Sequence, residues 1–270
     1  MSASDADNQT HTTGVLFTRG FGAAPTSTDL IKLLAVITMV VDHLGYFFFP
    51  DELWWRAVGR LSAPIWLFMI GYADTRTVPG RLWVGAGILV LLDLIIVDVL
   101  TPLNILFTMA LIRFALPVIE HRKLLALENY LPFLAIMVVL TPPSWFAIEY
   151  GTLAIIFACF GLMIRRKVSG VLLWVTIIAL AIIYAGWQRL YFEFDDAQTA
   201  FVAIGTASLL IALTLFKRVP LSRLAGMPIV APILRFTGRY TLEIYVVHIM
   251  VFGLIARFNQ GGPLIGAKLF

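Results

Sequence analysis

The chain has 270 residues, of which 60% are hydrophobic and 13% charged, with a mean hydropathy of +0.91 and a net charge of +4. A water-soluble domain carries about twice that charged fraction, so these values exclude a soluble globular protein and predict a polytopic membrane protein. A single cysteine, Cys159, excludes disulfide frameworks and thiolate metal clusters within one chain.

The apolar runs are long and show no alternation over about ten residues, the pattern that a membrane barrel strand requires. We therefore predict an all-α fold, a polytopic transmembrane helical bundle in which each span needs about 20 residues. Residues 1–28 are expected to be a flexible cytoplasmic tail, 29–258 the membrane domain and 259–270 a short outside tail. The pattern predicts nine spans, at residues 30–49, 53–73, 82–100, 103–119, 124–140, 145–164, 168–187, 198–216 and 240–257.

Turn residues separate these spans. Breaks are expected at Pro50, at Pro79-Gly80, at Pro102 and at Pro142-Pro143. Three prolines interrupt the semi-apolar stretch 219–237, for which a cytoplasmic loop, an interfacial helix and a re-entrant hairpin all remain open.

The orientation follows from counting Lys and Arg in alternate connections. One set of connections is strongly basic, as at Arg122-Lys123 and residues 165–167, whereas the other contains acidic groups such as Asp51-Glu52 and Asp195-Asp196. We predict a multi-pass membrane protein with its amino terminus in the cytoplasm and its carboxyl terminus outside. Contact with anionic membrane lipids accounts for the net charge, so no nucleic-acid partner is expected.

Several ionisable residues fall inside the predicted spans. Each charge at membrane depth costs roughly 2.5–3.5 kcal/mol even on lenient scales, so such residues are functional candidates that face a cavity or a partner. Their expected depths converge, together with that of Asn104, and predict one hydrated pocket that opens outward. These residues are Asp42, His43, Arg56, Arg60, Asp93, Asp98, Arg113, Glu149, Glu243 and His248.

Structural interpretations stay open for some of them. Asp42 and Arg60 alone could form an ion pair that fixes two neighbouring helices. His248 could be a core histidine with its hydrogen bonds satisfied, and Arg56 could extend to the outer headgroups. Glu243 lies four residues from Arg239, which makes a pairing between them the default interpretation.

A carboxylate, an imidazole and arginines in one pocket suit acyl transfer. A histidine can take a proton from an attacking amine or hydroxyl and return it to a leaving group. Arginines offer fixed positive charge to phosphate oxygens or to an oxyanion. Adjacent residues on a helix point about 100° apart, so Asp42 need not orient His43 directly.

Two consecutive segments resemble the opening of the TraX family, membrane proteins associated with amino-terminal acetylation of conjugative pilin. They are "LIKLLAVITMVVDHLGYFFFP" (30–50), with Asp42-His43-x-Gly45, and "WWRAVGRLSAPIWLFMIGY" (54–72), with Gly59-Arg60-Leu61 before Pro64. Weaker echoes follow in "LNILFT", "IEYGTLAI" and "RYTLEIYVVHIMVF", which contain Asn104, Glu149, Tyr150 and His248.

The resemblance implies an integral acyltransferase of the bacterial inner membrane, with its carboxyl terminus in the periplasm. It would use acetyl-CoA as co-substrate, with His43 as the base. Asp42 would be its partner or an acceptor-binding acid, and Arg60 a donor-binding or oxyanion-stabilising group, with Arg56 at an Arg-x-x-x-Arg spacing. Arg113 or the basic residues 165–167 could instead hold the CoA phosphates. Asn104, Glu149, Tyr150 and His248 are further substrate-binding candidates. The acceptor would be a pilin amino terminus, a glycan, a lipid or another amine, and no metal is expected.

Two other classes of protein stay open. A proton-coupled secondary transporter would also place Asp, His and Arg near the membrane midplane. A haem-binding electron carrier could use His43 and His248 as axial ligands. A purely structural membrane subunit gives no reason for so many ionisable groups at one depth.

Overall fold

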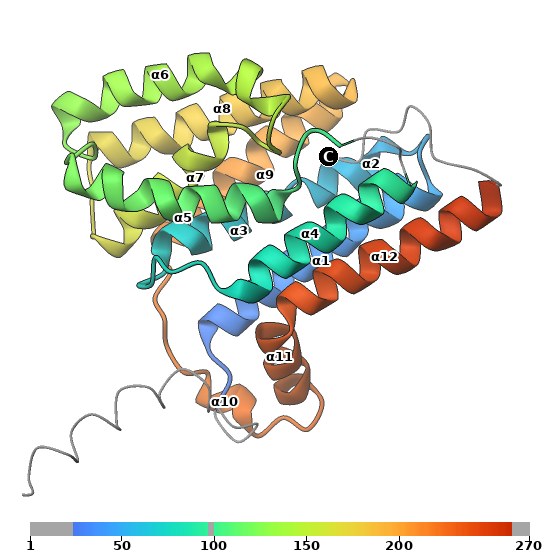
Figure 1. The fold of residues 1–270 in the computed structure, drawn as a ribbon. Coiled ribbons are helices and arrows are strands. Elements are labelled where there is room, and N and C mark those ends of the chain that lie inside the picture. Colours follow the sequence, from blue (N-terminus) through green and yellow to red (C-terminus); the bar gives the residue numbers. More distant parts are fainter. Residues whose placement is uncertain (1–23, 97–99, 261–270) are drawn as a thin grey trace, which may run out of the picture.

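A computed structural model describes residues 24–96 and 100–260 and shows a helical bundle (Figure 1). Helices make up 77% of the structure, and no strand forms in the described ranges. Asp98 and most of both predicted tails lie outside these ranges. The helices are α1 (Ser27–Phe48), α2 (Leu53–Gly59), α3 (Ser62–Tyr72), α4 (Gly80–Ile96), α5 (Ile105–His121), α6 (Leu127–Trp145), α7 (Leu153–Arg165), α8 (Val171–Phe192), α9 (Asp196–Thr214), α10 (Ser222–Ala225), α11 (Val230–Arg239) and α12 (Thr241–Gln260).

Four of these helices are long and apolar enough to cross a membrane: Ser27–Phe48, Val171–Phe192, Asp196–Thr214 and Thr241–Asn259. The expected membrane class and all-α fold are therefore supported, but nine spans are not confirmed. α4 and α5 have 17 residues each, and α7 has 13, which is shorter than the roughly 20 residues of a full crossing.

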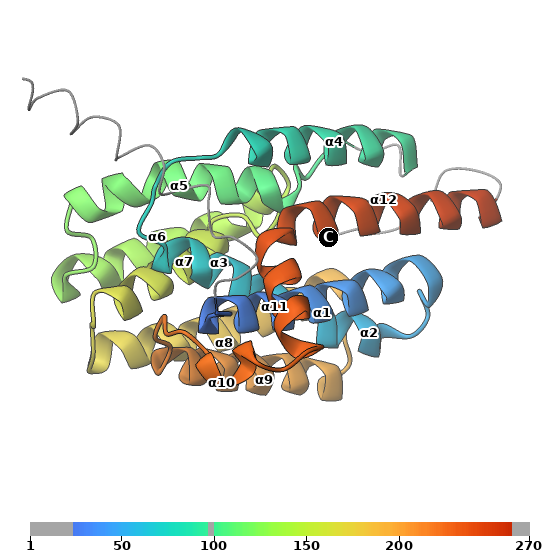
Figure 2. The same cartoon turned by 90° about the horizontal axis from the view of Figure 1, so that it is seen from below.

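The apolar helix α7 lies in the interior of the bundle, with every residue from Ile156 to Met163 buried. Two glycines bring α3 against it: a Cβ at Gly71 would lie 1.8 Å from the carbonyl oxygen of Ala158, and one at Gly161 would lie 2.1 Å from that of Phe68. α4 and α5 lie on one side of this core and α8 and α9 on the other (Figure 2).

The expected helix 53–73 is broken at Arg60-Leu61 into α2 and α3. Pro64 has no N–H, so it cannot donate to the carbonyl of Arg60 four residues earlier. The hydroxyl of Tyr184 in α8 donates to that carbonyl instead, at 2.7 Å. The carbonyl of Arg60 therefore has a hydrogen-bond donor despite the break, and Arg60 lies at a turn inside the bundle.

The break expected at Pro142-Pro143 is wrong, because α6 continues through both prolines to Trp145. Its last turn is supported by side-chain hydroxyls: Thr141 Oγ1 donates to a carbonyl 2.9 Å away, and Ser144 Oγ to one 2.6 Å away. The following helix begins at Leu153 rather than at 145. The intervening loop turns at Tyr150 and Gly151, both at positive φ, and enters the bundle.

The segment 219–237, left open by the sequence, contains the short helices α10 and α11. Both lie near the amino-terminal ends of α1 and α12, and α11 runs across the direction of the long helices (Figures 1 and 2).

Candidate active site

A cavity of about 500 Å³ extends from one end of the bundle into its centre, within the range of small-molecule sites. It follows α1 from Thr28 to His43, fifteen residues or about 22 Å of helix. Its inner part is lined by Asp42, His43, Arg60, Glu149, Tyr150 and Tyr245.

The cavity opens at the end of the molecule that carries the basic connections, whereas the sequence predicted an opening at the end that carries the acidic ones. The exposed residues that line the cavity, among them Asp74, Arg81 and Arg218, all belong to the basic end. At the opposite end, aromatic rings of α1 and α12 pack beyond His43: Phe47 and Phe48 lie 6.4 and 5.4 Å from Phe252, centroid to centroid. The depths of the site residues were predicted from the sequence, but the direction of access depends on how the helix ends pack.

Asp42 forms a buried cluster with both arginines of the α2 segment. Its Oδ2 accepts from Arg56 Nη1 at 2.9 Å and from Arg60 Nη2, and its Oδ1 accepts from Arg60 Nε at 3.1 Å. All three residues are 2–3% exposed. Both guanidinium carbons lie 4.8 Å from the ring centroid of Phe192, in cation–π contact. The alternative interpretation, in which Arg56 extends to the outer headgroups, is therefore wrong.

Small residues allow this cluster to form. A Cβ at Gly59 would lie 2.2 Å from Asp42 Cβ, and one at Gly45 would lie 2.3 Å from Trp55 Cβ. α1 and α2 thus pack closely, and Asp42 meets two guanidiniums rather than one. One carboxylate against two guanidiniums leaves an excess positive charge beside the cavity.

His43 contacts His248 rather than Asp42. His43 Nδ1 lies 2.9 Å from the carbonyl oxygen of Met39 and 3.0 Å from His248 Nε2, while His248 Nδ1 lies 2.8 Å from the carbonyl oxygen of Ile244. A carbonyl can only accept, so a neutral pair meets all three contacts only when each ring carries its proton on Nδ1 and the His43 N–H is shared between the Met39 carbonyl and His248 Nε2. His43 Nε2 then keeps a free lone pair, as a general base requires.

This contact also bears on the haem alternative. The two imidazoles are hydrogen-bonded to each other, which leaves no room for an iron between them. The described residues contain no group of three His, Cys, Asp or Glu side chains that could hold a metal ion.

The loop before α7 brings Glu149 and Tyr150 to the cavity, each 3% exposed. Arg60 Nη1 donates to the Tyr150 hydroxyl at 3.4 Å, and Thr108 Oγ1 donates to the Glu149 carbonyl at 2.8 Å. Glu149 Oε2 is buried and has no hydrogen-bond partner among the described residues. The carboxyl group of Glu149 thus has one oxygen whose hydrogen-bonding capacity is unused, beside the inner end of the cavity.

Asn104 does not line the cavity, although its position in the sequence suggested substrate binding. It caps α5 by accepting from Leu106 N at 3.2 Å, and its Nδ2 donates to the Ala86 carbonyl at 3.1 Å. The side-chain oxygen therefore caps α5, and the side-chain nitrogen joins the start of α5 to α4. Arg113 does line the cavity, nearer the opening, and donates to the carbonyls of Thr75 and Thr77 at 3.1 Å.

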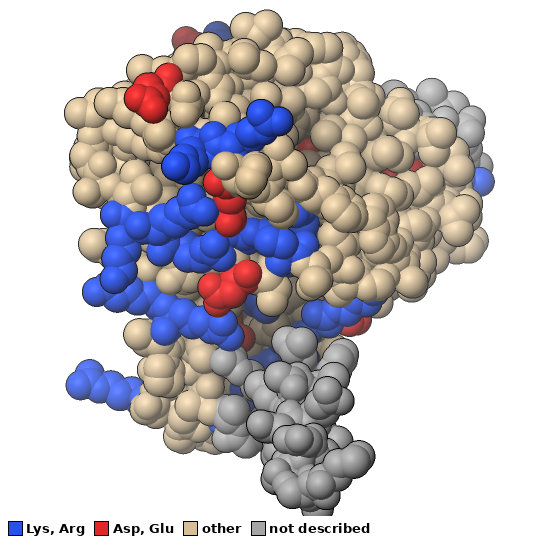
Figure 3. Space-filling model, turned by 60° about the vertical axis from the view of Figure 1, so that its left-hand side comes forward, with Lys and Arg blue, Asp and Glu red and all other residues tan. Residues whose placement is uncertain are grey.

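The mouth of the cavity contains four basic residues besides Arg113. The sequence showed these four only as members of the basic set of connections. Their position around one cavity could not be predicted, because they and Arg113 come from five separate segments of the chain. Figure 3 shows Lys and Arg side chains gathered at this end of the molecule. The cationic mouth, as we call it, consists of Lys32, Arg81, Arg113, Arg218 and Arg239.

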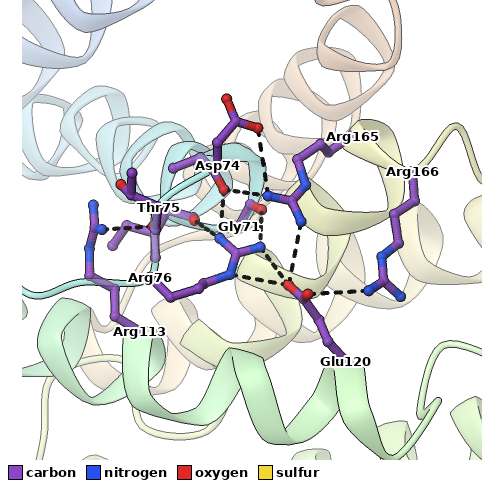
Figure 4. A network of polar contacts seen from close by, with 10 residues as sticks. Gly71, Asp74, Thr75, Arg76, Arg113, Glu120, Arg165 and Arg166 are labelled. Carbon is purple, nitrogen blue, oxygen red and sulfur yellow. Dashed lines mark hydrogen bonds and ion pairs between the residues drawn. The ribbon is translucent and has the colours of Figure 1, made fainter. Parts of the chain in front are cut away.

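A second polar network supports the wall of this mouth (Figure 4). Glu120 accepts from Arg76 at 2.6 Å and from Arg166 at 3.2 Å, and its carboxylate lies 3.6 Å from Arg165. Arg76 and Arg165 also donate to the carbonyl of Ala73 at 2.6 and 2.7 Å. Residues 165–167, considered as a phosphate clamp, do not line the cavity.

The charge of Glu120 is stabilised in this network. Partial burial favours the neutral acid, but the hydrogen bond from Arg76 and the charges of Arg166 and Arg165 outweigh it. They hold the pKa of Glu120 below its ordinary value. Elsewhere at this end, Glu243 pairs with Arg81 at 3.6 Å.

A family model described as TraX protein matches residues 27–256, from the first residue of α1 almost to the end of α12. The chain belongs to the TraX family. All the candidate residues from Asp42 to His248 lie within the matched range. The TraX resemblance first seen at residues 30–72 is therefore confirmed over most of the chain.

Another comparison gives a relative of this TraX protein. A protein of Rickettsia prowazekii (strain Madrid E), described as uncharacterized, is 29% identical over 139 residues, which cover 52% of this chain and 56% of that relative. The chain thus matches about half the length of this curated relative. No solved structure matches the chain.

Proposed function

We propose that this TraX protein is a membrane-bound, acyl-CoA-dependent acetyltransferase that moves an acetyl group from acetyl-CoA to an amine or hydroxyl. The observation that carries the proposal is the cavity itself: a free imidazole nitrogen and a guanidinium cluster lie at its inner end, and cations surround its mouth. No metal is needed for this chemistry. In this proposal the cationic mouth faces the cytoplasm, from which the donor enters.

The residues suggest a division of roles along the cavity. The cationic mouth would bind the phosphates of CoA, with Arg113 as its innermost member. A thioester arm could then follow α1 toward His43, about 22 Å from Thr28. Such an arm would bring the acyl carbonyl between His43 and Arg60.

The reaction would proceed by acyl transfer in two steps. The acceptor nitrogen or oxygen attacks the thioester carbonyl while His43 Nε2 takes its proton. Arg60, with its charge only partly balanced by Asp42, would stabilise the oxyanion. The carbon–sulfur bond then breaks, His43 returns the proton to the departing sulfur, and the products are the acylated acceptor and free CoA.

Glu149 and Asp42 differ in what they offer an acceptor. Asp42 is occupied by two arginines, whereas Glu149 Oε2 is unpaired among the described residues. We therefore assign acceptor positioning to Glu149 rather than Asp42. In the resembled pilin-modifying proteins the acceptor is an amino terminus; here a peptide amine, a glycan and a lipid amine are the acceptors to compare.

The test is transfer from radiolabelled acetyl-CoA by purified protein in lipid nanodiscs, with a peptide amine, an amino sugar or phosphatidylethanolamine as acceptor. We expect His43→Ala to lower the rate at least about 100-fold, the usual effect of losing a general base. His121→Ala removes an exposed histidine and should leave the rate unchanged. An undiminished rate in a folded His43→Ala protein would refute the assignment, and substrate-coupled proton flux without transfer would favour a transporter.

A further inference from the structure

The segment 217–239 forms a distinct surface at the basic end, which we call the α10–α11 surface. One side of α11 is fixed on α1: Leu234 is 0% exposed, and a Cβ at Gly238 would lie 2.2 Å from Asp29 Oδ1. Lys32 Nζ donates to the Gly238 carbonyl at 2.8 Å. The orientation of α11 is therefore set by close packing on a membrane-spanning helix.

The other side of α11 is apolar and exposed. Ile229, Ile233 and Phe236 are 72%, 45% and 51% exposed, and their spacing of four and three residues places them on one face. α11 has ten residues, about 15 Å, and runs across the long helices, so it does not cross the membrane (Figures 1 and 2). An apolar face on such a helix fits the boundary between headgroups and acyl chains.

Charge complements this face. Residues 217–242 contain five basic residues and no acidic one. Arg223 and Arg235 form no ion pair within the described ranges. Basic side chains near an anionic membrane surface are attracted to the lipid phosphates.

We propose that the α10–α11 surface lies on anionic lipid headgroups, with Ile229, Ile233 and Phe236 at the acyl boundary and Arg223 and Arg235 on lipid phosphates. A protein partner is disfavoured, because a stable interface needs about 800 Å² on each side and this stripe offers three side chains. The surface also continues into the cationic mouth through Arg218 and Arg239, so lipid contact would hold that side of the mouth in place.

The depth of α11 is measured with a nitroxide label on Ile233→Cys, because Cys159 is 0% exposed and does not compete for the label. Reference labels sit on Ile204→Cys, exposed in the middle of α9, and on Arg122→Cys, exposed in the α5–α6 connection. In phosphatidylcholine–phosphatidylglycerol vesicles, we expect the relative oxygen and nickel-chelate accessibility of Ile233→Cys to lie between the two references. A value equal to that of Arg122→Cys or of Ile204→Cys would overturn the proposal.

The charge preference needs its own measurement. We expect phosphatidylglycerol to raise the melting temperature of the protein in phosphatidylcholine nanodiscs, and Arg223→Gln/Arg235→Gln to lose at least half of that rise. Arg122→Gln/Lys123→Gln removes the same charge from another connection and should keep the full rise. If both double variants lose the same part of the rise, net charge alone explains it. That result would contradict binding of anionic lipid at the α10–α11 surface.

Discussion

The neighbouring residues Asp42 and His43 have separate partners because side chains one residue apart on a helix diverge by about 100°. Asp42 meets Arg56 and Arg60 on one face of α1, and His43 meets His248 on another. The carboxylate therefore holds the guanidiniums in place, and the imidazole remains available for proton transfer. The two residues should respond differently to substitution.

Asp42→Asn should destabilise the fold by about 3–5 kcal/mol, since it leaves two buried guanidiniums without their counter-ion. Thermal unfolding of the purified protein in detergent measures the loss. Asp74→Asn is the matched control, because the side chain of Asp74 is 80% exposed and its removal should change stability by no more than about 0.5 kcal/mol. Equal melting temperatures for the two variants would contradict a structural role for the cluster.

In the proposed mechanism His248 is a positioning residue, because its Nε2 accepts a hydrogen bond from the N–H that His43 keeps on Nδ1. His248→Phe removes that acceptor and should slow transfer about 10-fold, the value of one ordinary hydrogen bond of about 1.4 kcal/mol. His248→Gln keeps an acceptor oxygen and should recover part of the rate.

Nitrogen-15 NMR of the ring nitrogens reports the tautomer directly. The chain has four histidines, so only four pairs of ring signals need to be assigned. The wild-type protein should show His43 with its proton on Nδ1, and His248→Phe should show a mixture. A His43 spectrum that is the same in both proteins would leave His248 without this role.

At the scale of elements, the helix break at Arg60 shows how a proline is used. Pro64 leaves the carbonyl of Arg60 without its helical donor, and the hydroxyl of Tyr184 donates a hydrogen bond to that carbonyl instead. The resulting turn points Arg60 into the bundle. The pattern of apolar residues predicted a continuous helix there, because hydropathy does not register a missing backbone donor. The break predicted at Pro142-Pro143 was wrong, because hydroxyl side chains support the last turn of α6 and the helix continues through both prolines.

The connection after α3 depends on Glu120. Arg76 and Arg165 donate to the carbonyl of Ala73 in that connection, and the carboxylate of Glu120 balances their charge. Glu120→Gln should therefore lower stability at pH 7 by about 1.5–3 kcal/mol, the range for hydrogen bonds to charged groups. The pKa of Glu120 is depressed in the folded protein, so its contribution is complete above its unfolded value of about 4.3 and is lost as the pH falls through the folded value.

The difference in melting temperature between wild type and Glu120→Gln should accordingly be largest near neutral pH and should vanish in acid. Unfolding in detergent from about pH 7 to about pH 3 measures it. A difference that persists unchanged at the lowest pH would show that shape, rather than charge, holds the network.

At the scale of the whole molecule, the basic connections have a second use. They were interpreted as a signal of orientation, but four of their cations surround the mouth of a cavity: Lys32, Arg81, Arg218 and Arg239. Charge at this end thus serves both the proposed topology and the proposed donor site.

The proposed topology predicts which end a reagent can reach. In right-side-out membrane vesicles, a membrane-impermeant maleimide should label Asp51→Cys at once and Arg122→Cys only after permeabilisation. Cys159 is fully buried and should remain unlabelled in both. The reverse labelling pattern would place the cationic mouth on the outside and would remove cytosolic acetyl-CoA as the donor.

The sequence by itself determined the membrane class and the helical fold. It also singled out Asp42, His43 and Arg60 as functional candidates, because burying charge in lipid is costly enough to mark such residues without coordinates. Tertiary structure decided the partners: His43 with His248, 205 residues away, and Asp42 with two arginines rather than one. It also decided that Asn104 is a helix cap and that the cavity opens at the basic end. These features depend on how helices pack across long separations in the chain, and hydropathy along the chain contains no measure of that packing.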